Sequence, residues 1–172
     1  PLAIKGSFAG ALGLPQFMPG SIRRYAVDFD ADGRVDLTSS AADAIGSVAS
    51  FLMAHGWQRD APIVFEATAD EEVVDALGRG INVTVTWSDA LAAGVEGDVA
   101  LPLDAQVLVI DLPIVNADER TERLYRVGTV NFSALLHYNR SYFYASAVVE
   151  LSRAIAQAAT TPHPVATKDA LQ

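Results

Sequence analysis

The residues with the most evident chemistry form an acidic run that begins at Asp28. Asp28, Asp30 and Asp32 alternate with other residues and are followed by Gly33 and Arg34. This is the order of an EF-hand loop, in which alternate carboxylates converge on one hard cation and the glycine permits a sharp turn. Carboxylates brought so close repel one another unless a positive charge compensates them. The run therefore predicts a Ca²⁺ site.

The run departs from the EF-hand pattern where a bidentate glutamate should close the loop, because Ser39 stands there. We expect Asp43, at the start of the following helix, to close a longer loop instead. Ca²⁺ does not generate a strong nucleophile, so its predicted role is structural. The alternative is a solvated acidic turn. The predicted metal ligands are Asp28, Asp30, Asp32, Arg34 through its carbonyl, and Asp43.

A second segment, residues 7–21 with the sequence SFAGALGLPQFMPGS, combines glycines, prolines and one amide with large apolar residues. Glycines let a ligand approach the backbone closely. Gln16 offers both a donor and an acceptor to a sugar, and Phe17 and Met18 offer an apolar platform to a pyranose ring. The alternative is that Phe17 and Met18 belong to the core and Gln16 caps a helix. Spacing alone favours that alternative, because apolar residues are usually buried.

The elements that must position these residues are a mixture of helices and strands, so the predicted fold class is α+β. Residues 43–55 carry one apolar face at helical spacing and end at Gly56, which predicts a helix. Short, β-branched runs predict strands at 62–67, 82–87 and 106–112. Further helices are predicted at 70–77, at 88–93 with Ser88 as its cap, and at 141–159.

These elements divide the chain into four parts. We expect a core portion that holds the cleft wall and the acidic loop, a small β-rich insertion, a return to the helical core, and a frayed tail. Their predicted bounds are 1–60, 61–130, 131–159 and 160–172.

Composition excludes several classes of protein. The formal net charge of -9 and the scattered 12 Lys and Arg residues argue against a nucleic-acid partner. The chain has no cysteine, which excludes disulfides and thiolate metal sites. No run approaches the roughly 18 apolar residues of a membrane helix. The first residues, PLAIKGSFAG, resemble the middle of a folded domain, so we expect a missing N-terminal part.

Four blocks of sequence together resemble the lytic murein transglycosylase B family. They are SFAGALGLPQFMPGS, YAVDFDADGRVDL, DAIGSVASFLMAHGW and LLHYNRSYFYASAV, in family order. The resemblance implies a mainly helical, lysozyme-like core with an EF-hand-like calcium loop and a small inserted β domain. It also implies an enzyme, a carbon–oxygen lyase that cleaves the MurNAc–GlcNAc bond of peptidoglycan and leaves 1,6-anhydromuramic ends.

The family's catalytic glutamate acts first as general acid and then as general base. It lies upstream of the SFAGA block, so we expect no catalytic residue in this chain, which should be inactive without its missing N-terminal half. No organic cofactor is expected. The resemblance implies substrate-binding roles for residues beside that glutamate: Ser7, Gln16, Phe17, Met18, Tyr138, Asn139 and Tyr144.

The implied partners are peptidoglycan glycan strands, and the implied location is the periplasm. An N-terminal lipid anchor outside this chain would associate the protein with the outer membrane. The leading alternative is a non-catalytic, calcium-stabilised module that binds the cell wall without cutting it. A purely structural calcium-binding protein is a third reading, which the single incomplete EF-hand does not favour.

Overall fold

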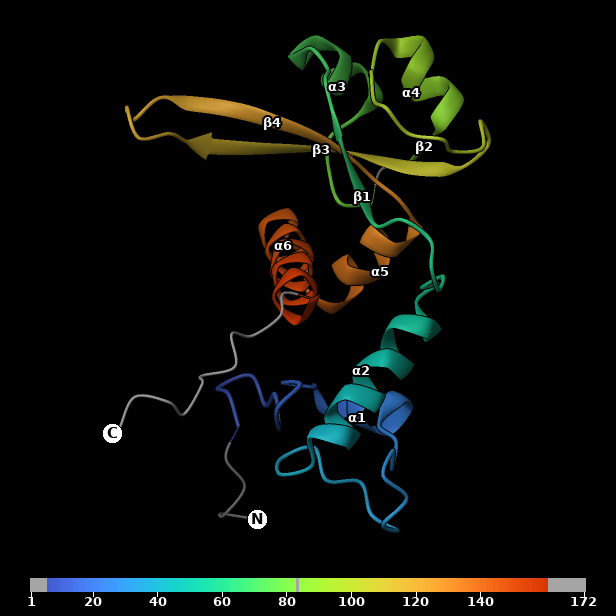
Figure 1. The fold of residues 1–172 in the computed structure, drawn as a ribbon, viewed down its shortest axis with the longest axis vertical. Helices are drawn as coiled ribbons and strands as arrows, with labels where there is room; N and C mark the ends of the chain where they lie inside the picture. Colours follow the sequence, from blue (N-terminus) through green and yellow to red (C-terminus); the bar gives the residue numbers. More distant parts are fainter. Residues whose placement is uncertain (1–5, 83, 161–172) are drawn as a thin grey trace, which may run out of the picture.

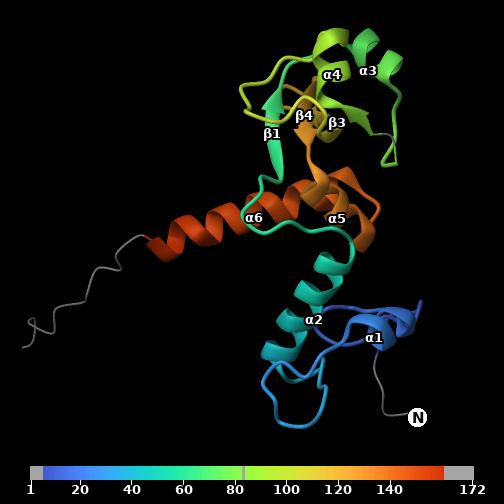
Figure 2. The same cartoon turned by 90° about the vertical axis from the view of Figure 1, so that its right-hand side faces the viewer.

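The computed structural model describes residues 6–82 and 84–160, which form a mixed helix-and-sheet fold (Figure 1). The sheet lies at one end of the molecule, α5 and α6 lie beneath it, and α1 and α2 lie at the other end (Figure 2). The elements in chain order are α1 (Pro19–Tyr25), α2 (Ala41–Ala54), β1 (Val64–Ala67), α3 (Glu71–Leu77), β2 (Val85–Thr86), α4 (Trp87–Ala93), β3 (Gln106–Val115), β4 (Thr121–Gly128), α5 (Val130–Tyr138) and α6 (Tyr142–Thr160).

The sheet is antiparallel throughout, with strand order β1-β4-β3-β2. Its centre is β3, which is covered on both faces because successive side chains point to opposite sides of a strand. Leu108, Ile110 and Leu112 pack against α5 and α6. Val107 and Val109 pack against the helices on the other face, α3 and α4. This two-sided burial explains why residues 107–110 of β3 form an unbroken apolar run.

The predicted helix after the acidic loop is confirmed, with its start slightly earlier than expected. It begins after Ser40, whose hydroxyl accepts a hydrogen bond from Asp43 N at 3.2 Å, and Asp43 lies in its first turn. Gly56 follows the C-cap with a φ of 88°, a conformation that glycine adopts without strain. The helix is therefore fixed at both ends by its own sequence.

Two predictions about the sheet region were wrong in detail. The predicted strand at 82–87 is only Val85–Thr86, because Trp87 begins α4 and packs against the face of the sheet that α3 and α4 cover. Residue 83 lies outside the described residues. The cap of α4 is Thr86 rather than Ser88, since the Thr86 hydroxyl accepts a hydrogen bond from Asp89 N at 3.1 Å. The predicted strands at 62–67 and 106–112 are observed with shifted ends.

Strand β4 was not predicted, because its charged residues hide its pattern. Arg123 and Arg126 lie on this strand, and both are paired with carboxylates of other elements. Arg126 pairs with Glu66, its direct cross-strand partner on β1, at 3.0 Å, and with Glu150 on α6 at 3.1 Å. The pair with Glu66 joins two strands of the sheet, and the pair with Glu150 attaches the sheet to α6.

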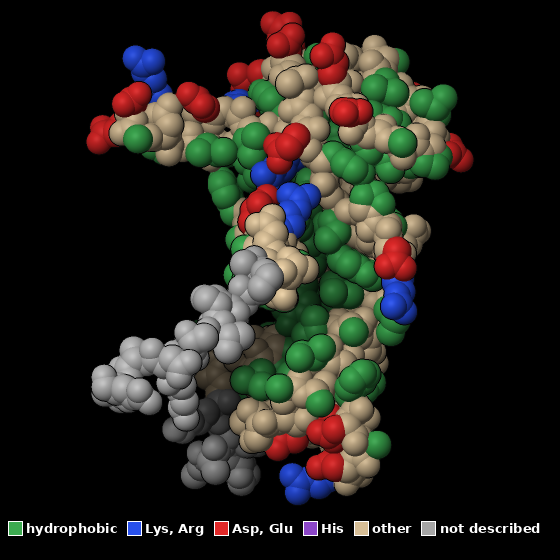
Figure 3. Space-filling model, viewed as in Figure 1, with side chains coloured by type: hydrophobic (Ala, Val, Ile, Leu, Met, Phe, Trp, Pro, Cys, Tyr) green, Lys and Arg blue, Asp and Glu red, His purple; other side chains and the backbone are tan. Residues whose placement is uncertain are grey.

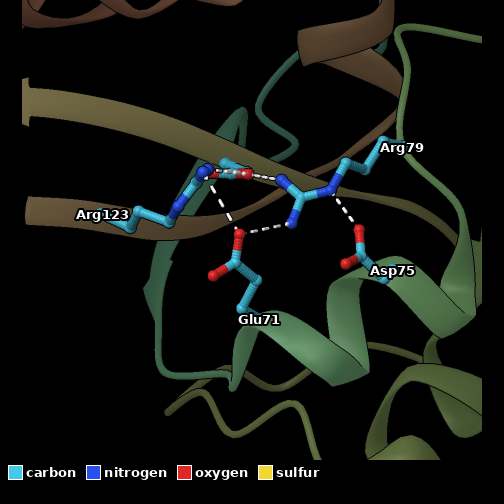
Figure 4. A network of polar contacts seen from close by, with 5 residues as sticks. Glu71, Asp75, Arg79 and Arg123 are labelled. Atoms are coloured by element: carbon cyan, nitrogen blue, oxygen red, sulfur yellow. Dashed lines mark hydrogen bonds and ion pairs between the residues drawn. The ribbon is translucent and has the colours of Figure 1, made fainter.

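An ion-pair network also attaches α3 to the β3–β4 hairpin (Figure 4). The Asp111 side chain on β3 is only 9% exposed and pairs with both Arg79 and Arg123. Glu71 on α3 pairs with the same two arginines, each at 3.2 Å, and Asp75 pairs with Arg79. Every carboxylate in this network therefore pairs with at least one guanidinium.

The end of the molecule that holds α1 and α2 has a separate aromatic core. Phe17, Leu37 and Phe51 are buried there, and Tyr25 and Tyr138 pack against them. On the face shown in Figure 3, hydrophobic side chains gather in the hollow beneath the sheet. Within residues 6–82 and 84–160, no helix has the length and apolar character needed to cross a bilayer. The predicted tail from 161 onward lies outside the described residues.

Candidate functional site

The acidic loop lies between α1 and α2 and brings three carboxylates together. Asp28, Asp30 and Asp43 each offer an oxygen, and these oxygens all lie within 4.8 Å of one another. Asp28 accepts hydrogen bonds from Asp32 N at 3.1 Å and from Gly33 N at 2.8 Å, which folds the loop back on itself. Gly33 has a φ of 91°, so the turn needs a glycine at this position.

Asp43 is the buried member of the group, with 1% of its surface exposed. One carboxylate oxygen accepts Phe29 N at 2.8 Å and the other accepts Asp36 N at 2.7 Å. The hydrogen bond from Asp36, then the one from Phe29, lowers the pKa of this carboxyl below its ordinary value, so the group is ionised at neutral pH. Asp43 thus ties both ends of the acidic loop to α2.

The three carboxylates have no cationic side chain of their own. In the part of the chain that the structure describes, none of the ion pairs involves Asp28, Asp30 or Asp43. A carboxylate oxygen that accepts one N–H keeps a further lone pair for a metal. Ca²⁺ prefers oxygen ligands, and carboxylates that no cationic side chain neutralises supply both the oxygens and the negative charge. The residues therefore fit a hard divalent cation.

The other predicted ligands are placed less directly. Asp32 is not part of the group of three, and its Oδ1 accepts a hydrogen bond from Arg34 N at 2.9 Å. Ser39, at the position where an EF-hand has its glutamate, donates its N–H to Asp36 instead. That hydrogen bond and the one from Thr38 lower the pKa of Asp36. Asp43, the ligand predicted to close a longer loop, is the carboxylate that lies beside Asp28 and Asp30.

The predicted glycan wall centres on the Gln16 turn. Gln16 is exposed and has a φ of 50°, a left-handed backbone conformation that is uncommon outside glycine. Its side-chain nitrogen donates to Gly13 O at 2.8 Å, which restrains the amide group. Met18 is 45% exposed beside it. Backbone strain of this kind tends to persist at binding sites.

Phe17 lies behind this surface rather than on it. Its ring is 3% exposed and packs at 5.7 Å from the Phe51 ring and 5.8 Å from the Tyr138 ring. This is the core placement that the spacing alone favoured, so Phe17 supports the wall from inside. Ser7 is exposed and accepts a hydrogen bond from Ala11 N at 3.0 Å, which shapes the turn that precedes Gln16.

Tyr138 joins the two halves of the predicted wall, which are more than a hundred residues apart in sequence. Its hydroxyl donates to the carbonyl oxygen of Pro15, next to Gln16. Its ring stacks on Tyr144 with centroids 6.4 Å apart and an interplanar angle of 6°. Burial, followed by the nearby Tyr144, raises the pKa of Tyr138 to about 12, so the hydroxyl remains a donor. Asn139 follows as the exposed C-cap of α5.

Sequence reasoning missed the rings that support this wall from below. His55, on the C-cap of α2, lies 4.1 Å from the Phe51 ring and 4.7 Å from the His137 ring. Tyr25 contacts both Phe51 and His55. Local spacing gave no sign of this, because the contacts join α1, α2 and α5. The wall therefore rests on a continuous aromatic cluster.

No glutamate lies at this surface with the setting that a general acid needs. A carboxyl acid with a raised pKa requires an apolar, enclosed environment. Every glutamate of the chain lies within the described residues and is exposed: Glu66, Glu71, Glu72, Glu96, Glu119, Glu122 and Glu150. The described surface therefore contains no enclosed glutamate.

Comparison with known proteins identifies the family. The model of the transglycosylase SLT domain matches residues 1–153 of this chain. The chain belongs to this family. It is 39% identical, over 158 residues, to membrane-bound lytic murein transglycosylase B of Escherichia coli; the match covers 92% of the chain and 41% of the relative. The chain therefore spans less than half of that relative's length.

Solved transglycosylase structures share the fold. The chain superposes on soluble lytic transglycosylase SltB1 of Pseudomonas aeruginosa with a TM-score of 0.82 and 42% identity, covering 94% of this chain and 52% of SltB1. It superposes on E. coli Slt35, solved in complex with calcium, with a TM-score of 0.80 and 38% identity, covering 94% and 49%. SltB3 of P. aeruginosa, solved with NAG-NAM-pentapeptide, gives 0.66 and 32%, covering 83% and 37%. The mixed helix-and-sheet fold is that of the lytic transglycosylases.

Proposed function

We propose that this chain forms one wall of the glycan-binding cleft of a peptidoglycan lytic transglycosylase. The reaction cleaves the MurNAc–GlcNAc bond and joins the muramic 6-hydroxyl to its own anomeric carbon, which leaves a 1,6-anhydro end. The observation that carries the proposal is the Gln16–Pro15–Tyr138 junction. It unites an exposed amide, an exposed thioether at Met18 and two stacked tyrosine rings on one surface.

This surface suits a sugar chain for three reasons. Gln16 can donate to and accept from hydroxyls and acetamido groups on one plane. Tyr138 and Tyr144 present aromatic rings beside polar hydroxyls, a combination that suits a ligand with an apolar face and polar edges. Asn139 adds a further exposed amide next to Tyr138. The relative SltB3, solved with NAG-NAM-pentapeptide, supports the same ligand class for this chain.

The catalytic glutamate of the reaction belongs, in this proposal, to sequence upstream of Pro1. Two observations support this: the chain spans about half of SltB1, and all of its glutamates are exposed. The upstream acid would protonate the leaving oxygen and then accept the proton of the 6-hydroxyl. The residues of this chain would hold the glycan against it. The chain alone would be inactive.

Calcium in this proposal is structural. Asp28, Asp30 and Asp43 would hold the ion, with Asp32 and the Arg34 carbonyl as further ligands, and its bound charge would remove the repulsion between the carboxylates. The loop would then fix α2 and, through Phe51, the aromatic cluster under Tyr138. Because the proposed substrate is peptidoglycan, the whole protein would act in the periplasm. Its acidic loop would be the EF-hand-like loop of the family, and its sheet would be the family's inserted unit.

The test is mass spectrometry of the soluble products released from purified peptidoglycan. The chain is compared with a version extended upstream through its native gene, and the extended version is also made with Gln16→Ala and Tyr138→Phe. We expect anhydromuropeptides from the extended version, fewer from both variants, and none from the chain alone. Release of no anhydromuropeptides by the extended version would overturn the proposal.

The exposed glutamates favour one second candidate, a module that binds the glycan without cutting it. Only the extended version of the protein distinguishes the two candidates, because neither predicts products from the chain alone. Binding of the extended protein to peptidoglycan that depends on Gln16 and Tyr138, without any anhydromuropeptide in the supernatant, would select the binding module. Product formation would exclude it.

A further inference from the structure

A cavity of about 290 Å³ lies beside α5. It is formed by Ile81, Asn82 and Thr84, by residues of α5 and by Arg140 after the helix. Its polar lining consists of Asn82, Thr84, Ser133, His137 and Arg140, over an apolar floor that includes Leu136. We propose that this cavity is a carboxylate-binding subsite that takes the peptide branch of the glycan, with Arg140 as the main anchor. The proposal rests on the function proposed above.

The charge of Arg140 is available to a ligand. Within the described part of the chain its side chain makes one long hydrogen bond, from Nη2 to Asn82 Oδ1 at 3.5 Å. None of the ion pairs found among the described residues includes Arg140, whereas Arg79, Arg123 and Arg126 each pair with two or more carboxylates. Other arginines also lack an ion pair among the described residues, but Arg140 is the arginine that lines this cavity.

The other polar groups of the cavity can complete an anion site. The hydroxyls of Thr84 and Ser133 and the amide of Asn82 are all hydrogen-bond donors. Burial, then His55 and Arg140, lowers the pKa of His137, which keeps its ring neutral and able to donate one hydrogen bond. A guanidinium with neutral donors around it matches a carboxylate, because Arg can bind both oxygens with a fixed geometry.

The position of the cavity points to the branch rather than to the sugar chain. His137 and Tyr138 are neighbours on α5, one lining the cavity and the other the proposed glycan wall. Arg140 follows Asn139 directly. A muramic residue held at Tyr138 and Asn139 carries its lactyl peptide away from the sugar ring, and such a peptide has free carboxylates. Neighbouring residues of α5 therefore line the cavity and the proposed wall, and Arg140 offers the cavity a positive charge that complements a carboxylate.

The test uses the 172-residue chain and two soluble probes, with binding followed by amide chemical shifts in NMR. The first probe is a capped cell-wall pentapeptide with free carboxylates, and its matched control is the same peptide with each carboxylate amidated. We expect Arg140→Gln to weaken binding of the free-carboxylate peptide about tenfold and Arg140→Lys to weaken it less, because a charge-assisted contact is lost or reduced. The amidated peptide should bind weakly to every variant.

Arg120→Gln is the matched control, since Arg120 is an exposed arginine on the β3–β4 turn that forms no ion pair with any described residue. It should bind both peptides as the unmodified chain does. Equal affinity of Arg140→Gln and the unmodified chain for the free-carboxylate peptide would overturn the subsite, as would tight binding of the amidated peptide.

The second probe, a neutral N-acetylglucosamine oligosaccharide, separates this proposal from the glycan wall. Binding of the oligosaccharide that depends on Gln16 but not on Arg140 supports the wall, whatever the peptide does. Arg140-dependent peptide binding without oligosaccharide binding supports the anion subsite and contradicts the wall. Melting curves confirm that each variant is folded.

Discussion

The molecule contains two groups of clustered carboxylates, which differ in the groups that contact their negatively charged oxygens. Beside the sheet, Glu71, Asp75 and Asp111 form ion pairs with Arg79 and Arg123 (Figure 4). In the loop between α1 and α2, the carboxylates of Asp28, Asp30 and Asp43 are held by backbone N–H groups and hydroxyls. In the first group each carboxylate pairs with a guanidinium, whereas among the described residues no ion pair involves the carboxylates of the second group.

This difference separates a structural network from a metal site. Backbone N–H groups orient carboxylates without cancelling their charge, so they prepare oxygen atoms for an external cation. Guanidinium groups cancel the charge and occupy the oxygens. We therefore expect the stability of the loop to depend on calcium and the stability of the sheet network to be independent of it.

The largest expected effect is the response of the loop to calcium. Calcium at about 100 times its dissociation constant should stabilise the folded chain by about 2.7 kcal/mol relative to excess chelator. For a chain of this size the melting temperature should rise by about 5–10 °C. Asp43→Asn should remove this rise, and Asp104→Asn, an exposed aspartate elsewhere, should retain it. Identical melting curves with calcium and with chelator would remove the metal from the account.

The next largest effect should come from the centre of the sheet network. Asp111→Asn keeps the shape of the side chain but leaves two guanidiniums facing each other without their shared, nearly buried carboxylate. We expect a loss of about 2 kcal/mol, less than for a fully buried pair because both arginines are partly exposed. The melting temperature should fall by about 4–8 °C. The fall should be the same with calcium and with chelator; a calcium-dependent fall would contradict the separation of the two groups.

A smaller effect is expected where the aromatic cluster meets the Gln16 turn. Tyr138→Phe keeps the stacked ring and removes the hydrogen bond to Pro15, which should cost about 1 kcal/mol, or about 3 °C in melting temperature. The raised pKa of Tyr138, about 12, means that the folded state holds this proton more tightly than the unfolded state. Stability should therefore fall as pH rises from about 10 toward 12. That alkaline loss should shrink in Tyr138→Phe, as measured by urea unfolding against pH.

The smallest effect belongs to the exposed edge of the network. Asp75 pairs with Arg79 at i,i+4 spacing, and both side chains are substantially exposed. Asp75→Asn should therefore lower the melting temperature much less than Asp111→Asn does, and this small fall should disappear in 1 M salt. A loss as large as that of Asp111→Asn would show that burial does not decide which of these pairs stabilises the sheet.

The grouping of Asp28, Asp30 and Asp43 could be predicted because it depends on residues close together in sequence. The spacing from Asp28 to Gly33 determines a turn, and Asp43 lies in the first turn of a helix whose ends are marked by Ser40 and Gly56. The prediction that Asp43 lies near Asp28 and Asp30 needed only a short loop. Its role as a calcium ligand remains a prediction.

The sheet region was predicted less well because its strands depend on contacts between residues that are far apart in sequence. Strand β4 reads as polar until Arg123 and Arg126 are placed opposite their carboxylates, and those partners come from β1, α3, β3 and α6. Trp87 reads as the end of a strand, yet it starts α4. In the glycan wall, the hydrogen bond from Tyr138 to Pro15 joins distant segments, and only the family resemblance had grouped them.

The most direct test of the contrast between the two groups is isothermal titration calorimetry of the chelator-treated chain with Ca²⁺. The account predicts one ion per chain, with binding lost in both Asp28→Asn and Asp43→Asn and retained in Asp111→Asn, each variant being checked for folding. Absence of binding by the unmodified chain, or unchanged binding by a folded Asp43→Asn variant, would contradict it.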